Sequence, residues 1–432
     1  AGKSILAAHD KRHDVVGPRS ECDYQYRAGT FHAVTNIDLS AELMPTCSGG
    51  QAMNASRIGI LQEALRKQGL ECAFLVPGPN LRYLTGLQLE AFERVILGIM
   101  PPAGDPVFVV PQLEADKVRA HIDSHIDAHI HCGAVFSYTD DAGPLDALRQ
   151  AFRALSLSLG LGSRVAGAEF LHMRLLDRDI IEEASGHDGS GCSLRFRDLG
   201  PIAARMRAVK GSDELAALKR AAQIVDTGIA AAASAIAPGI TEREVAAAVE
   251  RAMLAAGADS VPFNAVLAGA NSALPHGQTG DYEMREGDMV ICDIGATYRG
   301  YNGDITRTFA VGKPTPEMAR IYGVVYEANR AACQAARPGV TGEQLDSVAR
   351  DVIARAGFGE YFTHRTGHGL GLEIHEEPYI VQGAEEPLEA GMVFTIEPGI
   401  YIPGVGGVRI EDDLALTDDG CLVLTAFPRE LA

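Results

Sequence analysis

Four carboxylates in the second half of the chain are spaced as if they form one site. Asp293 and Asp304 lie in MVICDIGATYRGYNGDITRTF, residues 289 to 309, and Glu397 and Glu411 lie in similar strand-like segments near the C-terminus. Each pair could fold back as a hairpin, which would bring the four acids together. Like charges a few ångströms apart raise one another's pKa, and burial adds to the cost. Two divalent cations would balance these charges.

His368, in the glycine-rich segment TGHGLGLEIH, is the natural nitrogen ligand beside these acids. A mostly oxygen ligand set with one imidazole suits Mn, Co, Fe or Zn. Two such ions about 3.5 to 4 Å apart can hold a bridging hydroxide and polarise a carbonyl, which is hydrolytic chemistry. Each element is weak alone, because a single acid in a strand usually faces solvent and GHGLGL is usually a turn. HEEP at His375 is not the HExxH motif of a zinc protease, because residue 379 is tyrosine.

An internal repeat supports the grouping of the acids. The segments at 237–257 and 337–357 align without gaps, and each carries Pro-Gly, a capping box and a helix that ends at a glycine. Each helix is followed by a His-Gly pair and then by a strand-like run that contains an acid. Chance similarity of two helix-turn units is the alternative. Because all the features recur in one order, we expect a duplicated α+β half.

The segments before this repeat predict a different domain. Residues 57 to 69 read as an amphipathic helix, followed by a buried strand and a Pro/Gly turn. RVILGIMPP and PVFVVPQ are apolar runs of strand length, and helix and strand alternate to about residue 200. This alternation favours an α/β domain. Ser212 is the expected N-cap of the first long helix of the next block, which begins near residue 205.

Composition limits the classes of partner. The chain has 432 residues, of which 47 % are apolar and 22 % charged, as in soluble globular proteins. Its formal net charge of -19 argues against a nucleic-acid or anionic-membrane partner, because both need a basic surface. No apolar run approaches the roughly 18 to 20 residues that span a bilayer.

The cysteines and the N-terminal segment add two expectations. Eight scattered cysteines without a CxxC pair indicate reduced thiols in a cytoplasmic protein. Residues 1–52 show little periodicity and no signal-peptide pattern, so we expect a poorly ordered or non-native extension. The cysteines are Cys22, Cys47, Cys72, Cys132, Cys192, Cys292, Cys333 and Cys421.

Four motifs together resemble a known family. LPHG, DIGATYRGYNGDITRTF, HRTGHGLGLEIHEEP and GMVFTIEPGIYIPGVGGVRIED are similar to the pita-bread dinuclear metallopeptidases, and most closely to their Xaa-Pro dipeptidase (prolidase) and Xaa-Pro aminopeptidase branch. The similarity runs from about residue 205 to the end and extends weakly over 53–200, where NLRYLTG resembles the creatinase-type N-terminal domain.

The resemblance implies a fold and a domain order. We expect an α+β protein whose C-terminal pita-bread fold, at 205–432, contains an internal pseudo-twofold repeat and is preceded by an α/β creatinase-like N-terminal domain at 53–200.

The resemblance also implies roles for individual residues. The metal ligands would be Asp293, Asp304, His368, Glu397 and Glu411. Glu397 would also be the general base for the bridging water.

Four further residues are matched by position to substrate-contacting or orienting groups. His375 would steady the tetrahedral intermediate, His276 would lie over the substrate, His364 would contact it, and Arg409 would orient groups in the site. The alternative is that His276 and His364 are structural histidines and that Arg409 only neutralises the acids.

The predicted function is metal-dependent exopeptidase action on the Xaa-Pro bond at the N-terminus of dipeptides or short peptides. A non-catalytic binding protein and a creatinase-like amidinohydrolase on the same fold are the alternatives, and a complete ligand set argues against both. Dipeptidase and aminopeptidase P remain open. The resemblance implies two divalent ions, with Mn preferred over Co, Zn or Fe, a proline-containing peptide substrate, and a homodimer.

Overall fold

The structure is a computed structural model that describes residues 57–90, 92–124, 134–155, 165–186 and 194–431. The expected extension at 1–52 lies outside these residues, as do four of the eight cysteines. The four described cysteines, Cys72, Cys292, Cys333 and Cys421, are free thiols.

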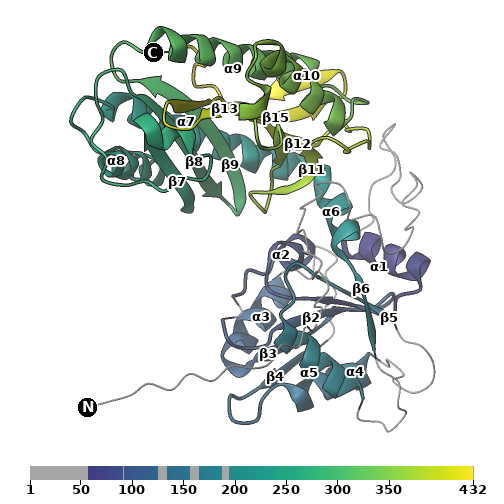
Figure 1. The fold of residues 1–432 in the computed structure, drawn as a ribbon. Coiled ribbons are helices and arrows are strands. Elements are labelled where there is room, and N and C mark those ends of the chain that lie inside the picture. Colours follow the sequence, from purple (N-terminus) through teal and green to yellow (C-terminus); the bar gives the residue numbers. More distant parts are fainter. Residues whose placement is uncertain (1–56, 91, 125–133, 156–164, 187–193, 432) are drawn as a thin grey trace, which may run out of the picture. The chain divides into compact units, whose positions relative to one another are not determined.

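The first described region contains a six-stranded sheet in the order β4-β3-β2-β1-β5-β6 (Figure 1). The central strand β1 pairs in parallel with β5 and antiparallel with β2. Strands and helices alternate, which confirms the α/β prediction. The strands are β1 (Ala73–Leu75), β2 (Leu97–Met100), β3 (Val107–Pro111), β4 (Val135–Tyr138), β5 (Val165–Ala168) and β6 (Arg195–Asp198).

Helices cover both faces of this sheet. Successive side chains of a strand point to opposite faces, so Leu75 packs in one apolar cluster with Leu61 of α1, while Phe74 packs in another with Leu148 of α4. The helices are α1 (Arg57–Gln68), α2 (Pro79–Thr85), α3 (Gln112–Ser124), α4 (Leu145–Ala154), α5 (Leu175–Ser185) and α6 (Gly200–Ala208).

The predicted Pro/Gly turn follows β1 at Pro77 and Gly78, and it leads directly into a short helix that the sequence analysis did not expect. NLRYLTG forms most of α2, which has Pro79 in its first turn and ends at Gly86 with φ 73°. Proline suits the first turn of a helix and glycine suits a left-handed C-terminal cap, so residues read as turn signals also delimit a helix.

The second described region is built from two related halves. The first half contains α7 (Ser212–Ala235), α8 (Glu242–Ala255), β7 (Ser260–Ala268), η3 (Gly269–Ala273), β8 (Met289–Tyr298) and β9 (Tyr301–Ala310). The second half contains α9 (Pro316–Ala335), α10 (Gly342–Arg355), η4 (Gly359–Tyr361), β10 (Gly367–Gly369), β11 (Glu376–Ile380), β12 (Val393–Ile396), β13 (Gly399–Ile402), β14 (Gly406–Arg409), β15 (Asp412–Thr417) and β16 (Gly420–Val423).

Equivalent contacts recur in the two halves. Thr241 and Thr341 both complete a capping box at the start of α8 and α10. The guanidinium of Arg220 donates to the carbonyl of Ala256 at 2.6 Å, and that of Arg320, one hundred positions later, donates to Ala356 at 2.9 Å. These matched contacts agree with the predicted internal repeat. One detail was wrong: Gly211 is the N-cap of α7 and Ser212 is its first residue, because the Glu214 side chain accepts from the Gly211 N–H.

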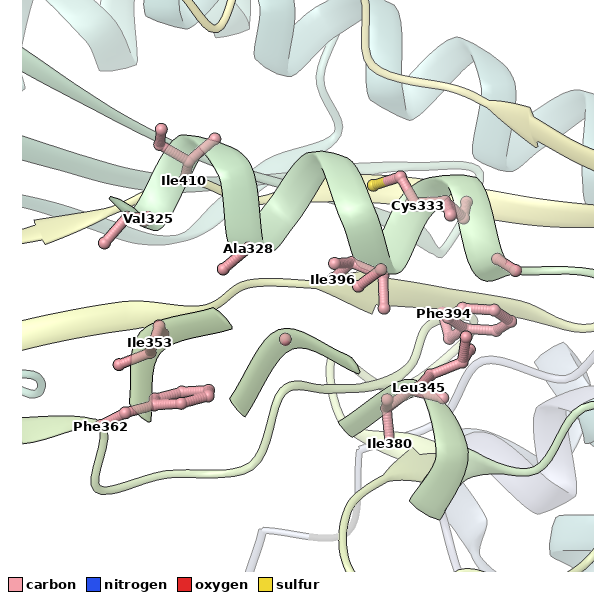
Figure 2. Close-up of a cluster of buried hydrophobic side chains, with 14 of the residues drawn as sticks. Val325, Ala328, Cys333, Leu345, Ile353, Phe362, Ile380, Phe394, Ile396 and Ile410 are labelled. Carbon is pink, nitrogen blue, oxygen red and sulfur yellow. The ribbon is translucent and has the colours of Figure 1, made fainter. Parts of the chain in front are cut away.

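The two halves form separate sheets that each pack against helices. Strands β7-β8-β9 form one sheet, β11-β10-β12-β15-β16 form another, and β13 and β14 form a two-stranded ribbon. Figure 2 shows α9 above the second sheet, where Val325 and Ala328 belong to the same buried cluster as Phe394 and Ile396 of β12. The sheets carry the candidate site: Asp293 and Asp304 lie within β8 and β9, and Glu397 and Glu411 lie directly after β12 and directly before β15. Among the helices of the described ranges, none combines the length and apolar character that spanning a bilayer requires.

Candidate metal centre

The β8–β9 hairpin positions the first two acids. Its turn has Arg299 at φ 50° and Gly300 at φ 82°, the left-handed pair that closes a two-residue hairpin. Asp293 is opposite Thr306 and Asp304 is opposite Gly295. Since side chains alternate along a strand, Asp293 and Asp304 are diagonal neighbours on one face of the sheet. The predicted hairpin is therefore present.

The second half supplies the other acids and the histidine. Strand β12 pairs antiparallel with β15, and Ile396 is opposite Asp412. Glu397 directly follows Ile396 and Glu411 directly precedes Asp412, so the two glutamates lie at the same end of this strand pair. His368 lies in β10, next to β12. The two halves are joined where the Glu411 N–H donates to the Thr306 carbonyl at 3.1 Å.

These elements bring ligand atoms together. One ligand atom each of Asp304, His368 and Glu411 lies within 4.8 Å of the others, and all three residues are buried. The His368 Nε2 is 3.4 Å from Glu397 Oε1 and 3.9 Å from Asp304 Oδ2. The structure thus groups four of the five predicted ligands around one imidazole nitrogen.

The hydrogen bonding of His368 fits a cation at this position. Its Nδ1 is 3.1 Å from the carbonyl of Gly369, which fixes the tautomer with the proton on Nδ1. The Nε2 lone pair then faces carboxylate oxygens, an arrangement that is repulsive when these acids are ionised and no cation lies between them. In the described structure the buried Asp304 Oδ1 has no hydrogen-bond partner, as expected of a ligand atom.

Electrostatics point the same way. Burial, reinforced by the neighbouring acids, raises the pKa of Asp304 and of Glu397 well above their ordinary values and that of Glu411 to about 7. Burial lowers the pKa of His368 to about 3, so this imidazole is neutral near pH 7. Without a cation the acids would hold protons. With divalent cations they can all be ionised, so the donor set fits metal ions.

Asp293, the fifth predicted ligand, is held by Arg409. The Arg409 guanidinium makes a short ion pair with Asp293 Oδ2 and donates to Tyr401 Oη at 2.8 Å. Arg409 is 4 % exposed, so it is a buried counter-charge for the acids. It therefore both orients Asp293 and neutralises the cluster, two roles that the sequence posed as alternatives.

The three further histidines lie in different environments. His364 is engaged at both nitrogens, with Nε2 2.9 Å from Tyr401 Oη and Nδ1 2.7 Å from the Arg365 carbonyl. Burial, with Arg409, lowers the pKa of His364 to about 3. His375 is exposed, and its ring centre lies 4.2 Å from that of His368. His276 is exposed next to Pro275, whose carbonyl is 3.5 Å from Arg409 Nη1.

The sequence analysis missed three residues that support the acids. Tyr401 links His364 to Arg409, Thr306 donates to Glu411 Oε2 at 2.6 Å, and Asp413 accepts from the Asp304 N–H at 3.0 Å. Their nearness in sequence to EPG, to Asp304 and to Glu411 was a usable signal. A single sequence gave no reason to prefer them to other polar neighbours.

Comparisons with known proteins agree with this geometry. Residues 216–418 match the metallopeptidase family M24, and residues 57–209 match the creatinase/prolidase N-terminal domain. The chain is 47 % identical over 370 residues to the Xaa-Pro dipeptidase of Pyrococcus horikoshii, which covers 85 % of this chain and 96 % of the relative.

Two further relatives cover similar lengths. The probable dipeptidase PepE of Mycobacterium tuberculosis is 39 % identical over 383 residues, 87 % of this chain and 96 % of the relative. The crystal structure of prolidase from Thermococcus sibiricus has a TM-score of 0.78 at 36 % identity, covering 88 % of this chain and 99 % of that chain.

Proposed function

We propose that the chain, which belongs to metallopeptidase family M24, is a metal-dependent hydrolase that cleaves the Xaa-Pro bond at the N-terminus of dipeptides or short peptides. The observation that carries the proposal is the buried group of Asp304, His368 and Glu411 beside Glu397, a donor set that fits divalent cations. A relative that is 47 % identical over 370 residues is named an Xaa-Pro dipeptidase. The comparisons do not favour the binding-protein or amidinohydrolase alternatives.

The metal ligands in this proposal are Asp293, Asp304, His368, Glu397 and Glu411. We propose two divalent ions, with Mn preferred over Co, Zn or Fe because oxygen donors dominate the set. When bound, the ions supply Lewis acidity that polarises the scissile carbonyl and lowers the pKa of a water molecule. The ionised form of each acid is then the stable one.

Glu397 is the proposed general base. It follows β12 and lies against His368, and its carboxylate is partly accessible. Because Glu397 is ionised when the ions are bound, it can take a proton from the attacking water. The same carboxyl can then give that proton to the proline nitrogen, which must be protonated to leave as an amine.

The surrounding residues bind and orient the substrate. His375 projects from the exposed side of the cluster and can donate a hydrogen bond to the carbonyl oxygen as it gains negative charge. His276, also exposed, is placed to cover the peptide. Arg409 orients Asp293, and His364 acts through the Tyr401 hydroxyl on Arg409. In this arrangement His364 positions groups and does not react.

Proline selectivity has a physical basis. An Xaa-Pro amide is tertiary and offers no N–H, so a site cannot recognise this bond by accepting a hydrogen bond from it. A site shaped around the ring and fixed by the ions can select it instead.

We further propose three properties of the whole chain. The creatinase-like domain covers 53–200, the catalytic domain covers 205–432, and residues 1–52 form an extension outside both. The protein acts in the cytoplasm, and it forms a homodimer. Light scattering after gel filtration tests the dimer, since a mass near that of one 45.8 kDa chain would contradict it.

The test of function compares three peptides on the Mn-loaded protein. Ala-Pro and Ala-Pro-Ala are supplied side by side, with Ala-Ala as the control for proline selectivity and a chelator as the control for metal. We expect Ala-Pro to be cut and Ala-Ala to be cut far more slowly. Release of Ala from Ala-Pro-Ala as well would assign aminopeptidase action. Cleavage of none of them by protein with two bound ions would refute the proposal.

A further inference from the structure

The ring of His375 is not held by its own contacts. The side chain is exposed, and in the described part of the chain no hydrogen bond to either ring nitrogen is found. Its ring meets that of His368 edge to face at 4.2 Å between centres. The position of His375 over the acid cluster therefore depends on the backbone of the loop from Gly371 to Glu376.

This loop is wrapped around the carboxylate of Glu376. Glu376 is 5 % exposed, and its Oε2 accepts from the Glu373 N–H at 3.2 Å. A Cβ on Gly371 would lie 2.4 Å from Glu376 Oε1, so only glycine fits there. The carbonyl of Gly371 accepts two hydrogen bonds from Asn302, two residues before Asp304. The loop that carries His375 thus has one buried charge at its centre.

Two cations bind that charge: Arg207 in the last turn of α6, and Lys210 in the connection between α6 and α7. Lys210 Nζ is 2.6 Å from Glu376 Oε1, and the two side chains are 1 % and 4 % exposed. Arg207 Nη2 forms short ion pairs with Glu376 Oε2 and with Glu373 Oε2. Lys210 Nζ also donates to the Arg207 carbonyl at 2.8 Å. Arg207 therefore binds a glutamate on each side of His375, and Lys210 binds the second of them, Glu376.

Stability alone does not account for this network. Moving a lysine, an arginine and a glutamate out of water costs about as much as their mutual attraction returns, and apolar residues of similar volume would stabilise the fold as well or better. A buried ion pair with directed hydrogen bonds instead holds the groups that it joins in one defined geometry. His375 is one of the two residues between the bound glutamates Glu373 and Glu376, and its proposed role depends on geometry.

We propose that Arg207 and Lys210 are positioning residues that hold His375 over the metal ligands through Glu373 and Glu376. The proposal rests on the catalytic role given to His375 above. It assigns a function to the α6–α7 connection, which lies outside the metal ligands and touches no substrate.

The test is a double-mutant cycle between Lys210→Met and His375→Ala. Methionine keeps the length of the lysine stem, and Glu376 retains Arg207 as its counter-charge, so no buried carboxylate is left unpaired. Arg205→Met is the matched control, because Arg205 lies in α6, five residues before Lys210, but pairs with Glu389 at the surface. Each variant is loaded with Mn, and its metal content, kcat and KM for Ala-Pro are measured.

We expect Lys210→Met to keep its metal and its KM and to lower kcat by about 10- to 100-fold, as for small misplacements of a catalytic group. In the His375→Ala background the same change should alter kcat by less than about twofold. Arg205→Met should leave kcat unchanged in both backgrounds. An equal loss from Lys210→Met with and without His375 would overturn the proposal, since it would show an effect on the fold in general.

Two further readouts keep the proposal open to refutation. Glu373→Gln, at a half-buried side chain, replaces Lys210→Met if that variant fails to fold, and the same cycle applies. The second readout is nuclear magnetic resonance of metal-free protein labelled at histidine. The signal of the His375 ring is identified by its loss in His375→Ala. This signal should shift or broaden in Lys210→Met. An unchanged signal would contradict positioning. If His375→Ala alone leaves kcat intact while Ala-Pro is still hydrolysed, the positioning proposal falls but the proposed function stands.

Discussion

Removal of metal should make the Glu411 carboxyl destabilise the protein as pH rises. Burial and neighbouring acids raise the pKa of Glu411 from its ordinary 4.5 to about 7. Below pH 4.5 this group is protonated in both the folded and the unfolded chain and contributes nothing. Between pH 4.5 and about pH 7, Glu411 is protonated in the folded chain and ionised in the unfolded chain. Stability is therefore lost progressively as pH rises from 4.5 to 7.

The size of this effect follows from the shift. A difference of about 2.5 pKa units corresponds to about 3 kcal/mol of the free energy of unfolding, fully lost above pH 7. For a domain of this size, 1 kcal/mol moves the melting temperature by about 2 to 4 °C, so between pH 5 and pH 8 the metal-free wild type should lose about 6 to 12 °C relative to metal-free Glu411→Gln. The comparison with the variant cancels the opposite contribution of His364 and His368, whose pKa values near 3 favour the folded state as pH rises through 6.5. Metal-loaded protein should lack this loss, because metal binding requires deprotonated ligands and strengthens with pH.

Scanning calorimetry of chelated and Mn-loaded protein at pH 5, 6, 7 and 8 measures this difference. Glu411→Gln keeps the shape and removes the charge, so the metal-free variant should melt higher than the metal-free wild type at pH 8. Glu386→Gln, at an exposed position, is the control and should leave the pH dependence as it is. The same change of melting temperature between pH 5 and pH 8 in metal-free wild type and metal-free Glu411→Gln, or a Glu411→Gln variant that melts lower than the wild type at pH 8, would refute the reasoning.

Three further predictions concern single positions. Asp304→Ala should bind less than two metal ions and lose hydrolysis of Ala-Pro, and a fully active variant would contradict the ligand assignment. Arg409→Met should lower kcat by about 10-fold or more with a smaller change in KM, because Asp293 loses its ion-pair partner, and steady-state kinetics will show whether kcat is retained instead. Gly303→Ala should destabilise the catalytic domain by about 1 to 3 kcal/mol, since the new Cβ would lie 2.6 Å from the backbone of Ala221 in α7, and an unchanged denaturation midpoint would contradict this packing.

The sequence predicted the acid cluster because local signals carried it. Asp293 and Asp304 flank a two-residue turn, and the same order of helix, His-Gly and acid occurs twice. Each of these two patterns can be recognised within a segment of about a hundred residues. Neither depends on how side chains from distant segments pack together. The helix starts at Thr241 and Thr341 were equally predictable, because a capping box involves only four consecutive residues.

The sequence did not predict the groups that hold the site in place. Lys210 and Glu376 are 166 residues apart, and neither lies in a pattern that distinguishes a buried ion pair from two solvated charges. Tyr401 is likewise defined by its contacts with Arg409 and His364, which exist only once the β13–β14 ribbon has formed. Such long-range contacts depend on tertiary packing, and a single sequence does not encode them in its periodicity.

The most direct test of the central claim is a titration of metal-free protein with Mn, with bound metal and the rate of Ala-Pro hydrolysis measured on the same samples. The account predicts no hydrolysis by the chelated protein, and a rate that rises with bound metal and reaches its maximum at two ions per chain. Hydrolysis of Ala-Pro by metal-free protein at the rate of the loaded protein would contradict it.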